Sequence, residues 1–197
     1  MLCEMQKEIY EKSGKLRRSI RLLLLISAIS ALLCGNLLAK TAKEIDASVD
    51  AAIERFYKQV IGGREFVKAA KGILVMPNVV KGAFIVGGEY GEGALRIDGK
   101  TVDYYNTVSG SIGLQIGGES KDIILCFMTD EALKNFRASK GWEAGVDGNV
   151  ALISIGAGQR ADTTTAKDPI VGFVFDAKGL IADLSIKGAK FTKLDIK

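Results

Sequence analysis

A chain of 197 residues with 48% apolar and 25% charged residues has the composition of one ordinary globular domain. It contains no histidine, which excludes histidine metal ligands and the Ser-His and Cys-His catalytic pairs. Six of its 27 basic and three of its 23 acidic residues lie in the first 39 positions, so the remainder is nearly neutral and does not favour nucleic-acid binding.

Residues 1–39 have the pattern of an export signal. Basic residues precede an apolar core at 22–33, and Ala39 offers a small residue for cleavage. We therefore expect a signal peptide over 1–39, cleaved near Ala39, and an exported protein that is periplasmic or associated with the cell envelope. Two alternatives stay open, an uncleaved membrane anchor over 22–39 and lipidation at Cys34. Beyond residue 39 the one cysteine is Cys126, in an apolar run that predicts a buried, inert thiol.

Residues 41–60 are predicted to form an amphipathic helix. Its apolar residues recur every three or four positions, and Thr41 and Glu44 have the spacing of a capping box. Such a helix lies on a membrane or packs on a sheet, and the mixed charge of its polar face favours packing. Gly62 and Gly63 end it. A second short helix over 64–71 places three basic residues near one another: Arg64, Lys68 and Lys71.

Residues 72–93 are predicted to form the central hairpin of the domain. An apolar run reaches Met76 and Pro77, turns through Asn78, and resumes over 79–86 before four glycines suited to bulges or tight turns. Both alternating faces of 83–86 are apolar, so we expect this strand to be covered on both sides.

The rest of the chain reads mostly as short strands separated by turns. Strands are expected over 94–97, 102–108, 112–117, 122–128, 150–155, and a hairpin over 170–186 that turns at 176–179. The strand 112–117 has one glycine-lined face. Thr129 or Asp130 is expected to cap a helix that ends at Gly141, followed by Trp142 in the core. The predicted class is α+β, with a glycine-rich, mostly antiparallel sheet or barrel-like core, N-terminal amphipathic helices and one helix inserted near 129–140.

No motif in the chain assigns a catalytic residue. The sequence G-x-x-G-x-G at 88–93 has the wrong order for a dinucleotide loop, and Asp98, Asp103 and Asp147 have the settings of turn or strand-edge carboxylates. We therefore predict no enzymatic activity, no cofactor and no metal site. Basic residues form three groups, each suited to anionic headgroups or to solvent: Arg64, Lys68, Lys71 and Lys81; Lys134, Arg137 and Lys140; and the C-terminal lysines.

Several glycine-centred blocks resemble, in their order, the SYLF lipid-binding domain family, also called the Ysc84-type actin- and phosphoinositide-binding domain. The blocks are AAKGILVMPNVVKGAFIVGGEYGEGAL, GSIGLQIGGESKDIILCF, GWEAGVDGNVALISIGAGQR and KGLIADLSIKGA. The resemblance covers about residues 42–192 and implies one non-enzymatic domain over 40–197, of the secreted bacterial branch. The last block departs from the family at 179–184, where an aromatic residue and a further glycine are usual.

The resemblance also implies where a membrane would be bound. The candidates are the helix 41–60 and the basic residues beside it: Lys40, Lys43, Arg64, Lys68 and Lys71. The expected partners are anionic membrane lipids, with a phospholipid or phosphoinositide-type headgroup, and no nucleic acid. The alternative is a structural or adaptor protein of the envelope that binds a protein partner through its glycine-lined sheet face.

Overall fold

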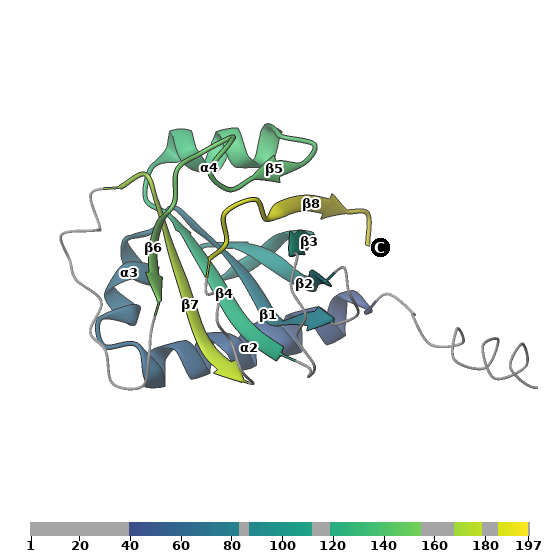
Figure 1. Ribbon diagram of the computed structural model, residues 1–197. Helices are drawn as coiled ribbons and strands as arrows, with labels where there is room; N and C mark the ends of the chain where they lie inside the picture. The colour runs from purple at the N-terminus through teal and green to yellow at the C-terminus, as the bar shows by residue number, and fades with distance from the viewer. Residues whose placement is uncertain (1–39, 83–86, 112–118, 155–167, 179–184, 197) are drawn as a thin grey trace, which may run out of the picture. The chain divides into compact units, whose positions relative to one another are not determined.

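The computed structural model describes residues 40–82, 87–111, 119–154, 168–178 and 185–196. This part of the chain is α+β, as predicted: three helices accompany one curled, half-barrel sheet of eight strands in the order β5-β8-β3-β2-β1-β4-β7-β6 (Figure 1). The helices are α2 (Ala42–Gln59), α3 (Gly63–Ala69) and α4 (Asp130–Ala138). The strands are β1 (Gly72–Gly82), β2 (Gly87–Ile97), β3 (Lys100–Ser111), β4 (Glu119–Phe127), β5 (Trp142–Glu143), β6 (Ala151–Ser154), β7 (Ile170–Lys178) and β8 (Lys190–Leu194).

The sheet is covered on both faces. Ile73 and Val75 of β1 pack toward α2 and α3, whereas Leu74 and Met76 belong to a second cluster with α4 on the opposite face. All four side chains are buried. Both faces of β1 are therefore covered at these residues. Residues 83–86, for which double coverage was predicted, lie outside the described residues.

Neighbouring strands are antiparallel except for β6 and β7, which run parallel. The predicted central hairpin is confirmed, because β1 and β2 pair with each other in the middle of the sheet. Its turn is not at Asn78. There β1 carries one more residue than its partners, since the register shifts between Val75 and Val80. A β-bulge accommodates Pro77, because it leaves a residue outside the regular hydrogen-bond ladder and proline has no N–H to donate. It also accounts for the positive φ of Asn78, +50°.

A buried carboxylate joins the bulge to the first helix. Asp122 of β4 accepts the Asn78 main-chain N–H at 2.8 Å through Oδ1. Its Oδ2 accepts from Arg55 of α2, with Arg55 Nη2 at 2.6 Å. The Asn78 N–H, which a hairpin turn would have used, is instead bonded to a side chain 44 residues away. This interaction explains why the chain continues as one strand through Pro77.

The amphipathic helix begins as predicted, at a complete capping box. The Thr41 hydroxyl oxygen accepts from the Glu44 N–H at 3.3 Å, and Glu44 Oε2 accepts from the Thr41 N–H at 2.7 Å. The apolar stripe of α2 packs on the sheet, with Ile45, Val49 and Phe56 fully buried. This is the arrangement that the mixed charge of the polar face predicts, in preference to a helix that lies on a membrane.

We expect Thr41→Ala to lower the free energy of unfolding by about 1 kcal/mol, because an alanine cannot accept from the first-turn N–H groups. Thr41→Ser retains the oxygen and should unfold within a few tenths of a kcal/mol of the parent protein. Equilibrium urea denaturation measures both. Equal midpoints for the alanine and serine variants would contradict a contribution from the cap.

Two other predicted elements differ from the structure, and one strand was not predicted. The inserted helix is capped by Thr129, as expected, but ends at Ala138, because the Ser139 N–H bonds back to Phe136 in an extended cap. Strand β7 runs through the predicted turn to Lys178, pairing as far as Ser120 of β4. The basic tail contains a strand, β8, that was not predicted.

Several predictions fall on residues outside those described: the signal peptide 1–39, the glycine-lined strand 112–117 and the second arm of the hairpin at 179–184. Among the residues that the structure describes, none of the helices combines the length and the apolar character needed to cross a membrane.

Candidate functional site

A glycine turn brings α3 against α2. Gly62 adopts φ +87°, a left-handed conformation that side chains disfavour, and directly precedes α3. A Cβ on Gly63 would meet Phe56 at 2.8 Å, so only glycine allows α3 to start this close to the last turn of α2. Phe66 then anchors α3 through an edge-on contact with Phe173 of β7, with ring centroids 5.1 Å apart.

Three of the five predicted site residues lie together on and beside α3. Arg64 and Lys68 are exposed and one helical turn apart. The Arg64 guanidinium lies over the Tyr57 ring at 4.1 Å from its centroid, a cation–π contact that holds it in place. Lys71 follows α3 and is half exposed; its ion pair with exposed Asp130 spans 3.9 Å and is therefore weak. We call Arg64, Lys68 and Lys71 the α3 cations.

A groove of about 370 Å³ runs beside these cations. Helices α2 and α3 form its walls, and the start of β1 and the end of β2 form its floor. Its apolar lining includes Ile53, Tyr57 and Val67, and its charged lining consists of Lys68, Arg96 and Asp98, two basic residues and one acidic residue. The groove thus combines an apolar wall with basic groups, which suits a ligand that is both anionic and partly apolar.

Arg96 supplies a largely buried positive charge on the groove floor. Its side chain is 14% exposed and pairs with Asp50 at 2.5 Å and Asp46 at 3.7 Å, both on α2. Its Nε is buried and has no hydrogen-bond partner among the described residues. Arg96 therefore fixes the helix to the sheet and keeps one donor unused beside the groove. No sequence pattern indicated this role, because Arg96 lies within a strand far along the chain from Arg64, Lys68 and Lys71.

Lys40 and Lys43, the other two predicted site residues, lie at the opposite end of α2. Both are exposed. Lys43 is in the first turn and Tyr57, under Arg64, is in the last, so about 20 Å of helix separates them. The structure brings Arg64, Lys68 and Lys71 together and leaves Lys40 and Lys43 apart from them.

Residues 108–195 match the family model described as Ysc84, Las17-binding protein actin regulator. The resemblance drawn from the glycine-centred blocks is thereby confirmed, while the assignment to a secreted bacterial branch stays a prediction. No curated protein matches the chain. The α3 cations and the groove precede the matched residues.

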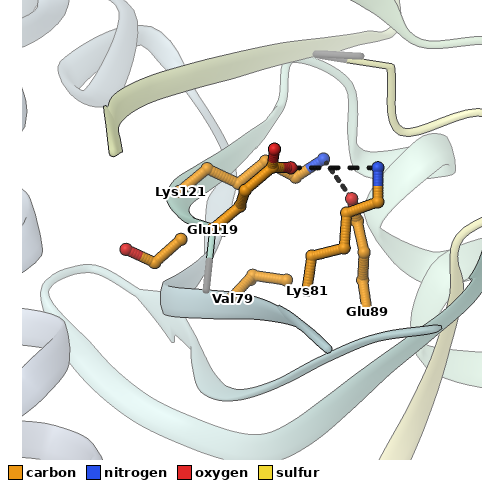
Figure 2. A pocket seen from close by; sticks show the side chains of 6 residues that line it. Val79, Lys81, Glu89, Glu119 and Lys121 are labelled. Atoms are coloured by element: carbon orange, nitrogen blue, oxygen red, sulfur yellow. Dashed lines mark hydrogen bonds and ion pairs between the residues drawn. The ribbon is translucent and has the colours of Figure 1, made fainter. Parts of the chain in front are cut away.

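Residues 108–195 contribute half of a second charged cluster, on the other face of the sheet. Lys121 is 4% exposed, and its Nζ lies 3.0 Å from Glu89 Oε1 (Figure 2). Lys81 faces Glu119 at 3.9 Å in the same cluster. The hollow between them, about 10 Å³, is the size of one water molecule. The sequence grouped Lys81 with Arg64, Lys68 and Lys71, but Lys81 does not lie with the α3 cations. It is near the far end of β1, on the other face of the sheet.

Cys126, also among the matched residues, is buried as predicted. Burial raises the pKa of its thiol to about 12, so the thiolate is not populated near neutral pH. No cluster of potential metal ligands occurs among the residues that the structure describes.

Proposed function

We propose that this protein is a non-enzymatic lipid-binding protein that docks on an anionic membrane of the cell envelope through the α3 cations. The Ysc84 family is one of lipid- and actin-binding domains, which supports a binding role. The observation that carries the proposal is the gathering of Arg64, Lys68 and Lys71 around one short helix beside a mixed groove.

The electrostatics of this surface favour an anionic partner. Each Lys or Arg close to an anionic membrane contributes about 1 kcal/mol. The α3 cations are free to contribute, because Arg64 rests on an aromatic ring and Lys71 makes only a weak exposed pair. A phosphoinositide-type headgroup could use the same arrangement, with its phosphates near Lys68 and the Arg96 side chain that lines the groove.

The mode of binding follows from the burial of α2. Its apolar stripe is packed on the sheet and cannot enter a bilayer while the domain is folded. Membrane contact is therefore a surface interaction that depends on charge and on the groove. It should weaken as salt is added, since exposed charges are screened within about 8 Å at physiological ionic strength.

The test is co-sedimentation of residues 40–197, which form one compact unit, with neutral and anionic liposomes. We expect binding to anionic vesicles at low salt and none to neutral vesicles. Replacing Arg64, Lys68 and Lys71 with glutamate should weaken binding by at least roughly a hundredfold, because about 3 kcal/mol of attraction is removed.

A matched control carries the same change of charge elsewhere. Lys134, Lys140 and Lys187 are exposed and lie outside the groove lining; their replacement with glutamate should leave most of the binding intact. If both triple variants lost the same amount of liposome binding, the net charge of the protein alone would explain the loss. The α3 cations would then not be the binding surface. No binding by the unmodified protein would overturn the proposed function.

The alternative, an envelope adaptor for a protein partner, has one specific observation in its favour. Val80, Tyr90 and Val108 face each other in register across β1, β2 and β3, and each is about half exposed. The glycine-lined face on which this alternative was first predicted lies outside the described residues. A folded protein that binds neither type of vesicle would favour the adaptor function.

A further inference from the structure

Glu92 on β2 is a buried carboxylate with an unusual set of partners. Glu92 is only 5% exposed to solvent. Oε1 accepts the Tyr90 hydroxyl at 2.7 Å, and Oε2 accepts the main-chain N–H of Lys40 at 3.3 Å. Among the residues that the structure describes, Glu92 forms no ion pair.

Both partners donate hydrogen bonds without supplying a charge. Burial together with the bond to Glu92 raises the pKa of Tyr90 to about 12, so its hydroxyl remains protonated and neutral in this setting. The residue opposite Glu92 on β3 is Asn106, also neutral. Burying a carboxylate without a counter-charge is strongly unfavourable. One positive charge next to Glu92 would therefore stabilise the folded protein.

We propose that Glu92 binds the α-ammonium group that signal-peptide cleavage creates at Lys40. Hydrolysis of the peptide bond between Ala39 and Lys40 by a signal peptidase consumes one water and leaves a carboxylate on Ala39 and an ammonium on Lys40. The nitrogen that already lies against Glu92 is the atom that becomes charged. The same contact thus changes from a neutral hydrogen bond in the precursor to an ion pair in the mature protein.

The position of Lys40 makes this pairing specific. Lys40 directly precedes Thr41, whose capping box fixes the start of α2. A positive charge at a helix N-terminus is opposed by the helix dipole, so an uncompensated α-ammonium there would destabilise the folded protein. Glu92 compensates it. Cleavage near Cys34, or retention of residues 1–39, would leave the Lys40 nitrogen as an uncharged amide.

The first experiment locates the mature terminus. The full chain is expressed in a host that exports it, and the recovered protein is measured by intact mass spectrometry. We expect a chain that begins at Lys40. A mass that corresponds to a start at any other residue, a lipid on Cys34 or an intact 197-residue chain would overturn the proposal. This result is independent of whether the protein binds lipid.

The second experiment measures the charge on that terminus in the exported protein. An α-amine titrates at about 7.7–8 when unperturbed, and pairing with Glu92 raises its pKa in the folded state. Acylation of the α-amine at pH 7 should therefore be at least tenfold slower than in Glu92→Gln, since one pKa unit is a tenfold change in free amine. Glu54→Gln removes an exposed carboxylate of α2 and should react like the parent. Equal rates for the parent and Glu92→Gln would exclude the ion pair.

The pH dependence of the thermal stability of the parent protein provides a third test, which does not depend on whether Glu92→Gln folds. Because the folded-state pKa is raised, the stabilisation is fully present below about pH 7.7 and is lost as the pH rises through the folded value. Acylating the α-amine of the parent protein should therefore lower its Tm at pH 7 and have little effect at pH 10. No Tm change at pH 7 would contradict the pairing. The other titratable groups facing this site are Tyr90, Glu44 and the Lys40 side chain, and the acylated protein retains all three.

Discussion

Gly93→Ala is expected to prevent the domain from folding. A Cβ at Gly93 would lie 1.9 Å from the Val75 carbonyl oxygen and 2.9 Å from the Met76 Cα. Both are main-chain atoms of β1, so no rotation of a side chain relieves the clash. Gly93 lies opposite the bulge at Pro77 and Asn78, where β1 crowds its partner strand. We expect a loss of at least about 4 kcal/mol, comparable to the whole stability of many domains.

The control for this substitution is Gly110→Ala on β3. Gly110 is exposed, and a Cβ there would meet no atom within 4 Å. Soluble yield and the near-ultraviolet circular dichroism of the purified proteins compare the two variants. A Gly93→Ala protein with the spectrum and thermal midpoint of Gly110→Ala would show that the two strands are farther apart than the structure has them.

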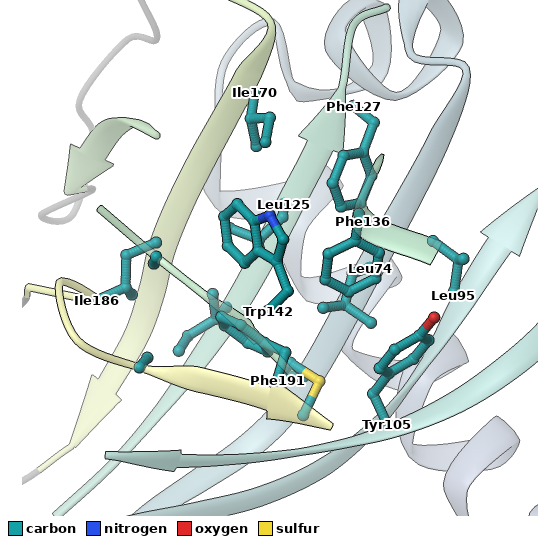
Figure 3. Packing of buried hydrophobic residues seen from close by; sticks show 14 of the residues in the cluster. Leu74, Leu95, Tyr105, Leu125, Phe127, Phe136, Trp142, Ile170, Ile186 and Phe191 are labelled. Carbon is teal, nitrogen blue, oxygen red and sulfur yellow. The ribbon is translucent and has the colours of Figure 1, made fainter. Parts of the chain in front are cut away.

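Phe136→Ala is expected to destabilise the domain by about 3–5 kcal/mol, the usual loss when a buried phenylalanine is truncated. Phe136 of α4 is fully buried at the centre of an aromatic cluster (Figure 3). Its ring centroid lies 4.9 Å from that of Tyr105, 4.8 Å from Phe127 and 5.6 Å from Trp142. These neighbours come from three different strands, which cannot close together over the cavity.

Urea unfolding measures this effect, because the chain has a single tryptophan. Trp142 is in edge-on contact with Phe136, so its fluorescence reports on the cluster itself. Phe136→Leu, which leaves a smaller cavity, should lose clearly less than Phe136→Ala. Lys134→Ala on the exposed side of α4 should leave the midpoint almost unchanged. A Phe136→Ala midpoint equal to that of Lys134→Ala would contradict the central position of the ring.

Features decided by local chemistry were predictable from the sequence. The capping box of α2 needs only Thr41 and Glu44, and the Thr129 cap needs only its own side chain and the Ala132 N–H. The closeness of Arg64 and Lys68 likewise follows from helical spacing. These interactions span three or four residues, so the pattern contains everything that determines them.

Features decided by distant residues were not predictable. Asn78 is compatible with a turn or a bulge, and the choice depends on Asp122, far along the chain. Strand β8 presents lysines and one buried aromatic, Phe191, and is recognisable only from its pairing with β3. The groove has the same origin: Arg96 joins its floor because β2 passes beneath α2 and α3.

The place of β8 has a consequence for the order in which the chain assembles. Leu194 pairs with Tyr104 and Phe191 with Thr107, so β8 lies inside the sheet, between β5 and β3, although it is far from β3 in the sequence. Until Lys190–Leu194 is in place, this ladder is incomplete and the cluster around Phe136 lacks Phe191. Contacts between such distant segments slow folding. Pairing of β8 with β3 is therefore expected to be one of the slower steps in forming the sheet.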